Sequence, residues 1–396
     1  MKAEWVVKTL GSVSSINYGY TESASRSPVG PRFLRITDIQ NDNVNWDKVP
    51  YCKIDVADRP KYQLASGDIV FARTGATTGK SYLVIEPPEA VFASYLIRLK
   101  LTDKRLLPEF VILFFQTEMY WKSIAEGSTG SAQGGFNATK LGALSIPIPP
   151  ILEQQRIVTI LDEAFAGIAT ATANAEKNLA NARELFQNYL QSTFSNKGDR
   201  WEEKTLKEVC EKITDGTHQT PKYFDSGVIF LSSRNVTSGK IDWDNIKYID
   251  EKQHLDMHKR VAPRIGDILL AKNGTTGVAA MVDRDLVFDI YVSLAHIRVL
   301  DKVSPEFMLY FINSPFAKKQ FNKRLKGSGV PNLHLEEIRE VVIPFPKSHQ
   351  EQRQVVQKLD ELSNQTKKLE AIYQQKLIAL EELKKSILNQ AFSGNL

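Results

Sequence analysis

An internal duplication constrains this chain more than any other feature of its sequence. Short blocks in the first half recur in the second half in the same order, 196 to 199 residues later. Trp5–Leu10 matches Trp201–Leu206, and Glu153–Glu163 aligns without gaps to Glu351–Glu361. A repeat of this length is several times longer than the ~20–50 residues of a solenoid repeat. It therefore predicts two whole domains of one type, each followed by the same tail.

Further blocks at the same spacing place the domain boundaries. They pair Gly67–Val70 with Gly266–Leu269, Arg73–Gly79 with Lys272–Gly277, Ile146–Pro149 with Ile343–Pro346, and Phe194–Ser195 with Phe392–Ser393. The Ile-Pro blocks stand just before the tails, and proline is tolerated before a helix but not inside one. We therefore expect a first domain at 1–148, a spacer helix at 149–196, a second domain at 197–345 and a last helix at 346–396.

Each tail is predicted to form one long helix. Between Glu153 and Ser195 there is no proline and a single glycine, Gly167. Apolar or small residues recur in both tails at alternating steps of four and three, the spacing of a coiled-coil seam. The first seam is rich in alanine and the second in larger side chains, so close packing favours antiparallel pairing of the two helices. The alternative is that each helix packs on its own domain. The residues expected at the helix-pair interface are Leu161, Ile168, Ala175, Ala182, Tyr189, Leu359, Leu369, Tyr373, Leu380 and Ile387.

Short alternating segments inside each domain predict strands. Examples are 68–72 and 95–99 in the first copy and 267–271 and 296–299 in the second, with helical segments at 108–124 and 305–324. The expected fold class is α+β: two similar mixed α/β domains separated by two long antiparallel helices that form a coiled coil.

Composition excludes several classes of protein. The two cysteines, Cys52 and Cys210, stand alone, so neither a disulfide framework nor a metal site is expected. The N-terminus has no apolar signal region, and no stretch has the ~18 apolar residues of a membrane span. A reducing cytoplasm is the expected compartment. The net charge of +5 permits a nucleic-acid partner without requiring one.

The sequence contains none of the catalytic motifs considered below. Gly75–Ser81 is similar to a phosphate-binding loop, but that loop needs four residues between its glycines and this segment has three. The second copy has Val278 where the lysine should stand. The methyltransferase motif Asn-Pro-Pro-aromatic, the Gly-x-Ser-x-Gly elbow and His-Glu-x-x-His are not found. We therefore expect no catalytic residue and no cofactor in this chain.

The ordered set of motifs resembles the specificity subunits of Type I restriction–modification systems. The resemblance covers the whole chain: the duplication, the Gly-Asp-Ile/Leu blocks followed by a basic residue and glycines, and the Ile-Pro junctions before Glu-Gln and Arg. The ending Ala391–Gly394 and the segment Asp215–Pro221 also fit the family. The first copy has Tyr18–Pro28 in place of that segment, so its recognition surface is expected to differ.

This resemblance implies a DNA-reading subunit without catalysis of its own. Each domain would be a target-recognition domain for one half of a split, asymmetric site in double-stranded DNA. The helices would set the spacing and dock two methyltransferase subunits, and a restriction and translocation subunit would join the complex. S-adenosylmethionine would be bound by the methyltransferase partner, for methylation at adenine N6.

Candidate DNA contacts are polar residues in turns and loops after predicted strands. Arginine can read guanine and asparagine can read adenine, but turn chemistry explains the same residues. Gly-rich loops at 127–135 and 326–332 can contact phosphates or simply connect elements. The candidates are Arg35, Thr37, Arg73, Thr74, Lys80, Gln133, His218, Arg234, Asn235, Lys272, Asn273, Lys326 and Asn332.

Two other classes of function remain open at this point. One is an interaction scaffold whose coiled coil binds partners and whose domains read no DNA. The other is an enzyme acting alone, such as a nuclease. Scattered acids such as Asp68 and Asp267 could imitate one, but a Gly-Asp pair before a strand is more typical of a turn, and no acidic cluster accompanies it.

Overall fold

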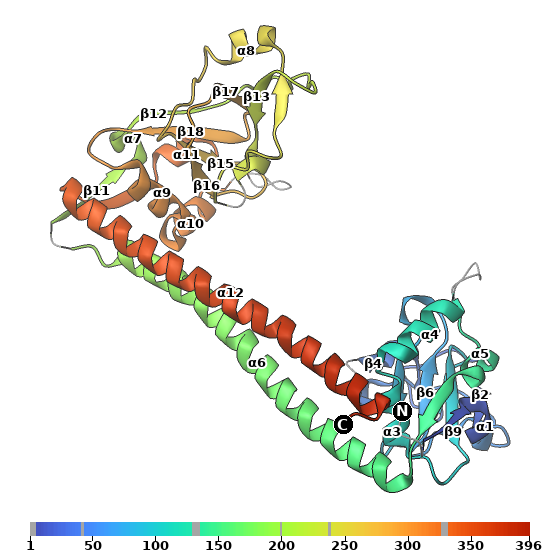
Figure 1. Cartoon of the computed structure of the whole chain (residues 1–396). Coiled ribbons are helices and arrows are strands. Elements are labelled where there is room, and N and C mark those ends of the chain that lie inside the picture. The colour runs from blue at the N-terminus through green and yellow to red at the C-terminus, as the bar shows by residue number, and fades with distance from the viewer. Residues whose placement is uncertain (1–4, 41–42, 129–134, 199, 237–238, 326–331) are drawn as a thin grey trace. The chain divides into compact units, whose positions relative to one another are not determined.

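The computed structural model describes residues 5–40, 43–128, 135–198, 200–236, 239–325 and 332–396 (Figure 1). It divides into two compact units. Unit 1 contains residues 1–175 and 375–396, and unit 2 contains residues 176–374. Both units therefore combine one copy of the repeat with the end of a long helix that comes from elsewhere in the chain.

Unit 1 is built around a four-stranded sheet in which all neighbours are antiparallel. The strand order is β2 (Ser14–Tyr18), β9 (Leu96–Leu101), β6 (Ile69–Ala72) and β7 (Ser81–Leu83). All four residues of β6 are buried. A strand covered on both faces needs a continuous apolar run, and Ile-Val-Phe-Ala supplies one.

Smaller elements cover the two faces of this sheet. The pairs are β1 (Val6–Thr9) with β10 (Ser145–Ile148), β4 (Ile39–Gln40) with β5 (Asn43–Val44), and β3 (Arg32–Leu34) parallel to β8 (Ala90–Phe92). The helices are α1 (Leu10–Val13), α2 (Arg59–Tyr62), α3 (Pro108–Phe114), α4 (Glu118–Ser128) and α5 (Ala138–Ala143), with 3-10 turns η1 (Ile36–Asp38), η2 (Trp46–Lys48) and η3 (Gly75–Thr77).

Unit 2 repeats this topology. Its four-stranded sheet has the order β12 (Cys210–Asp215), β18 (Leu294–Val299), β15 (Ile268–Ala271) and β16 (Ala279–Met281). A second sheet contains β14 (Lys247–Ile249), β13 (Val228–Leu231) and β17 (Phe288–Ile290), and β11 (Trp201–Thr205) pairs with β19 (Val342–Pro346). The helices are α7 (Leu206–Val209), α8 (Glu251–Met257), α9 (Pro305–Asn313), α10 (Pro315–Asn322) and α11 (Leu335–Arg339), with η4 (Ser233–Val236).

The matching strand orders confirm that the sequence repeat is a repeat of one fold. The parallel pair β3 and β8 corresponds to the parallel pair β13 and β17, and the central strand β6 corresponds to β15. The prediction of two similar domains of mixed helix and strand is therefore confirmed.

The two tails form unbroken helices, α6 (Ile151–Ser195) and α12 (His349–Ser393). Their segments run antiparallel within each unit; in unit 2 they lie side by side, and in unit 1 they diverge toward the domain (Figure 1). In unit 1, Arg156 donates a hydrogen bond of 2.7 Å to the main-chain oxygen of Leu396. In unit 2, Arg183 forms an ion pair of 3.0 Å with Glu370.

The last residue but one of each helix is a phenylalanine that completes a domain core. Phe392 of α12 packs on Phe110 of α3, with ring centroids 4.8 Å apart. Phe194 of α6 packs edge-on against Phe307 of α9, with ring centroids 5.4 Å apart. The tail that follows one copy therefore closes the core of the other copy.

The buried positions of the helices depart from the predicted seam. Leu161, Leu359, Ala175 and Ala182 are buried, and Ile168, Tyr373, Leu380 and Ile387 are partly buried. Tyr189 and Leu369, predicted on the same seam, are 41% and 39% exposed, and Leu179, Leu190 and Phe194 are buried on α6 instead. A straight helix drifts by about 20° per heptad from a strict 3.5-residue repeat, so a seam projected over many turns loses its phase.

Within the described ranges, no helix combines the length and apolar character needed to cross a lipid bilayer.

Candidate nucleic-acid interface

The turn after the central strand has glycines of similar conformation at its start and end in both copies, although the first turn is one residue longer. It begins with Arg73 and Thr74 after β6, and with Lys272 and Asn273 after β15. The glycine that follows has a φ of 74° in the first copy and 73° in the second, and the glycine that ends the turn has a φ of 94° and 80°. Glycine adopts such positive φ values without steric cost, so the repeated glycines are explained by backbone geometry.

The turn meets the Gly-rich loop in each unit. The Phe136 N–H donates a hydrogen bond of 2.9 Å to the carbonyl of Arg73, and the Leu333 N–H donates an equal bond to the carbonyl of Lys272. Asn273 and Asn332 form an isolated antiparallel bridge beside the second of these bonds. In both copies the turn therefore lies beside the residue that directly follows the Gly-rich loop. Gln133 and Lys326 lie outside the described residues.

In the first copy this surface displays an arginine against aromatic rings. The Arg73 guanidinium lies over the ring of Tyr18, 4.9 Å from its centroid, where a cation–π contact is favourable. The Arg73 N–H donates to the carbonyl of Tyr95, whose side chain is 61% exposed. Among the described residues, Arg73 Nε is buried and has no hydrogen-bond partner. The guanidinium is thus held on the ring of Tyr18, without an ion pair to a carboxylate in the described part of the chain.

In the second copy the corresponding cation is buried. Lys272 is 5% exposed, and its Nζ lies 3.0 Å from the carboxylate of Asp215, which also bonds Arg260 and His218. Burial opposes ionisation of Asp215, but the hydrogen bonds from Arg260 and Lys272 outweigh it and lower the pKa of this carboxyl. The prediction that Lys272 is presented to DNA is therefore corrected: its charge is committed to a buried carboxylate.

Tyr18 and Asp215 occupy the same place in the two copies, because they pair with corresponding residues of β9 and β18. The next residue in each copy is a glycine. A Cβ added to Gly19 or Gly216 would lie 2.2 or 1.9 Å from a carbonyl oxygen at the end of the neighbouring strand. The backbone is thus held alike, and the side chains beside the turn differ.

His218 remains accessible beside this ion-pair cluster. Its side chain is 63% exposed, with Nε2 3.2 Å from Asp215. It therefore remains a candidate contact, next to the ion pair between Asp215 and Lys272.

Two further candidates prove to be turn residues. Asn235 is 6% exposed; its Oδ1 accepts from the Ser232 N–H at 2.9 Å, and its Nδ2 donates to the carbonyls of Asp242 and Asn245. Its amide has no capacity left to read adenine, so the predicted DNA contact is corrected. In the first copy Asp38 takes this position and accepts from the N–H of Arg35 at 2.9 Å.

Arg35 is also engaged within its own turn. Its guanidinium donates two hydrogen bonds to Asp38, at 2.8 and 3.0 Å, and these bonds raise its pKa. Within the 3-10 turns η1 and η4, the exposed candidates are Thr37 and, at the corresponding position, Arg234. Thr37 and Arg234 therefore remain candidate DNA contacts.

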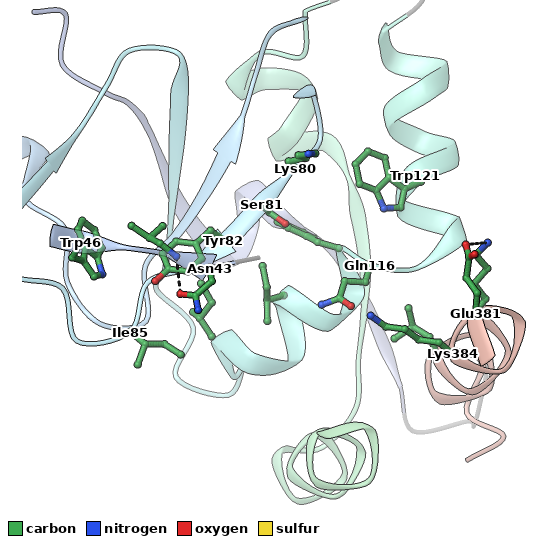
Figure 2. Close-up of a pocket in the computed structure, with 16 residues that line it drawn as sticks. Asn43, Trp46, Lys80, Ser81, Tyr82, Ile85, Gln116, Trp121, Glu381 and Lys384 are labelled. Carbon is green, nitrogen blue, oxygen red and sulfur yellow. Dashed lines mark hydrogen bonds and ion pairs between the residues drawn. The ribbon is translucent and has the colours of Figure 1, made fainter. Parts of the chain in front are cut away.

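Lys80, at the far end of the turn, is exposed and lines a groove in unit 1 of about 810 Å³. In Figure 2 the side chains of Gln116 and Lys384 point toward one another across this groove, and Trp121 lies between Lys80 and α12. A second hollow, of about 570 Å³, is lined by Thr37 and Lys48 and shares Asn43 with the first. Thr37 and Lys80 therefore border neighbouring hollows.

Sequence reasoning missed Tyr95 and Arg260 and attached no role to Tyr18. Tyr18 lies where the first copy departs from Asp215–Pro221, and that difference between copies was the available signal. Tyr95 and Arg260 are placed only by tertiary contacts, and no local pattern marks them.

Comparison with known proteins agrees with these observations. The model of the Type I restriction modification DNA specificity domain matches residues 2–179 and again residues 198–381. The specificity subunit of the Type I restriction enzyme EcoKI from Escherichia coli K12 is 22% identical over 421 residues, covering 99% of this chain and 89% of that protein. The MjaVIII specificity subunit of Methanocaldococcus jannaschii is 23% identical over 346 residues, covering 83% and 79%.

Solved structures share the fold. The HsdS subunit from Thermoanaerobacter tengcongensis has a TM-score of 0.64 at 20% identity, covering 100% of this chain and 98% of that one. A chain from a study of complex assembly and conformational transition of the type I R-M system has a TM-score of 0.79 at 21% identity, covering 100% and 99%. Since the family model matches nearly all of both copies, the chain belongs to the Type I restriction–modification specificity family, with two DNA specificity domains.

Proposed function

We propose that this chain is the non-catalytic specificity subunit of a Type I restriction–modification complex. Recognition domains at 1–148 and 197–345 each read one half of a bipartite, asymmetric target in double-stranded DNA. The observation that carries the proposal is the contrast at one site of a duplicated fold: Tyr18 and Arg73 in one copy, Asp215 and Lys272 in the other. A shared backbone fold with different side chains suits two domains that recognise different DNA sequences.

The spacer helices, at 149–196 and 346–396, set the distance between half-sites and dock two methyltransferase subunits. Apolar side chains left in solvent on the helices support docking, among them Leu185 and Tyr189 on α6 and Ile378 and Leu383 on α12. Exposed apolar groups that gather on one element mark protein contacts. The complex would include a restriction and translocation subunit, and S-adenosylmethionine would be held by the methyltransferase.

Domain exchange tests this function. The chain is co-expressed with its methyltransferase partner, and modified adenines are mapped across the host genome. Replacing residues 1–148 by the corresponding domain of a relative should change one half of the modified site and leave the other half and the spacing unchanged. An unchanged modification pattern would contradict the proposal. DNA binding by the complex should also weaken steeply with salt, because phosphate contacts release counterions, whereas a scaffold that reads no DNA would not show this dependence.

A further inference from the structure

Unit 2 contains a cluster of two imidazoles and one carboxylate. His254 lies on α8, His258 follows one turn later at the end of that helix, and Asp289 is the middle residue of β17. Their candidate ligand atoms all lie within 4.8 Å of one another. Nδ1 of His254 is 2.7 Å from Oδ2 of Asp289, and Nδ1 of His258 is 3.0 Å from Oδ1. Both imidazoles therefore face the same carboxylate, one at each oxygen.

The fold itself does not require this carboxylate. In unit 1 the corresponding residue of β8 is Val91, which pairs with Phe33 as Asp289 pairs with Phe230. Asp289 is 1% exposed and stands between two buried apolar residues. Burying a charge is unfavourable unless it is paired or coordinates a metal, so Asp289 needs partners that Val91 does not. The two histidines are those partners.

The donor set is one that transition metals prefer. Histidines four residues apart lie on one face of a helix, and the opposing strand adds a carboxylate oxygen. Two imidazoles, one carboxylate and a solvent molecule make a tetrahedral zinc site, and Co²⁺ and Ni²⁺ accept the same ligands. The side chains of His254 and His258 are 13% and 31% exposed, which leaves a route for an ion and for a fourth ligand.

We infer that His254, His258 and Asp289 form a binding site for a divalent transition metal of the zinc type. The ion takes the place of the two hydrogen bonds to the carboxylate, with each imidazole coordinating through Nδ1 and keeping its proton on Nε2. No metal site was predicted from the sequence because the two cysteines stand alone and no His-Glu-x-x-His motif occurs, whereas the signal was the four-residue spacing of His254 and His258 on a helix.

The site would hold in place residues 215–222, a segment near the start of the second recognition domain. Gln253 of α8 accepts from the Lys222 N–H at 2.8 Å and donates to the Lys222 carbonyl at 3.0 Å. Arg260, just after α8, bonds the side chain and carbonyl of Asp215. A metal that ties α8 to β17 therefore holds both ends of the segment that carries His218.

Cobalt binding to the full-length chain tests the site directly. The purified chain is stripped with a chelator and titrated with Co²⁺, whose visible absorption reports tetrahedral coordination, and Zn²⁺ is then added as competitor. One equivalent of Co²⁺ should bind and be displaced by Zn²⁺. His254→Gln and His258→Gln should each weaken binding at least tenfold. His349→Gln, at the exposed start of α12, is the matched control and should bind as the parent chain does.

Absence of a tetrahedral cobalt band in the parent chain would overturn the inference, and so would equal affinity in the His258→Gln and His349→Gln chains. In either case the three side chains would be a hydrogen-bonded set only. Circular dichroism of the metal-free variants checks their folding. If both glutamine variants unfold, Asp289→Val, which introduces the residue of the first copy, removes the ligand without leaving a buried charge and must also lose the band.

Discussion

The Arg73 guanidinium lies 4.9 Å from the ring centroid of Tyr18, and at the corresponding positions of the second copy Lys272 lies 3.0 Å from Asp215. An arginine over an aromatic ring can still donate through its terminal nitrogens, because the contact uses the face of the guanidinium. A lysine buried against a carboxylate has its charge balanced by that partner. The cation of this turn therefore contacts an aromatic ring in the first domain and a buried carboxylate in the second.

Substitution at these two positions should therefore give opposite results. Arg73→Ala should weaken binding to the first half-site by about 1–3 kcal/mol, the value of a good arginine–guanine contact, with little change in Tm. Lys272→Ala should lower the free energy of unfolding by about 1–3 kcal/mol, because it removes a partner from a buried carboxylate. DNA titrations of the assembled complex and thermal unfolding of each variant measure the two effects. A large loss of stability in Arg73→Ala together with none in Lys272→Ala would contradict this assignment.

Two matched carboxylates should respond to acid in opposite directions. Burial opposes ionisation of Asp267, but hydrogen bonds from His296 and Arg298 outweigh it and lower its pKa to about 2. Burial dominates at Asp68, the corresponding residue of the first copy, and raises its pKa. The stability contributed by Asp267 is present above the unfolded pKa of ~3.9 and is lost as the pH falls to about 2. The contribution of Asp68 is present at low pH and is lost as the pH rises through its raised pKa.

Asparagine substitutions test this difference. Asp267→Asn should cost roughly 2 kcal/mol of unfolding free energy at pH 7 and progressively less below pH ~4, because protonation removes the same interaction from the parent chain. Asp68→Asn is the control and should cost less at pH 7. Urea unfolding across this pH range measures both variants. A loss in Asp267→Asn that stays constant down to pH ~2 would show that the lowered pKa plays no part.

The phenylalanine at the end of each long helix should matter to the domain on which it packs. Phe392→Ala should destabilise the first domain, and Phe194→Ala the second, each by about 3–5 kcal/mol. The reason is that removal of a buried ring leaves a cavity between aromatic neighbours. Hydrogen exchange resolved by peptide should show faster exchange in β6 for Phe392→Ala and in β15 for Phe194→Ala. Leu369→Ala, on an exposed position of α12, should stay within about 0.5 kcal/mol. If each variant instead lost hydrogen-exchange protection only in the domain that precedes its helix in the chain, the packing of each tail on the other copy would be refuted.

Two neighbouring residues of η4 should have different roles, Asn235 in the stability of the domain and Arg234 in DNA binding. Asn235→Ala should cost about 1–3 kcal/mol of stability, because the carbonyls of Asp242 and Asn245 and the Ser232 N–H lose their partner. Arg234→Ala should leave Tm nearly unchanged and weaken DNA binding by the complex, since its side chain is exposed. Thermal unfolding and DNA titration of the two variants provide the comparison, and equal losses of stability would contradict it.

Agreement between sequence and structure depends on the range of the interactions involved. The strand at 69–72 and the helix that starts at Pro108 follow from local periodicity and from proline chemistry, and the structure has both. The exposure of Tyr189 was not predictable in this way, because a small error in helical phase accumulates over many turns. The roles assigned to Lys272 and Asn235 were wrong because their partners, Asp215 and Asp242, are brought to them by folding.

The amino-acid sequence by itself determined that one fold is used twice, that each copy is followed by a long helix, and that the segments at Tyr18–Pro28 and Asp215–Pro221 differ between the copies. These properties follow from self-similarity and from periodicity, which are visible in one dimension. Only the tertiary structure decided which cation is buried and which is displayed, which helix end closes which core, and that His254, His258 and Asp289 meet. The physical reason is that burial and pairing depend on contacts between segments far apart in the chain, and such contacts determine whether a polar side chain stabilises its own domain or faces a partner.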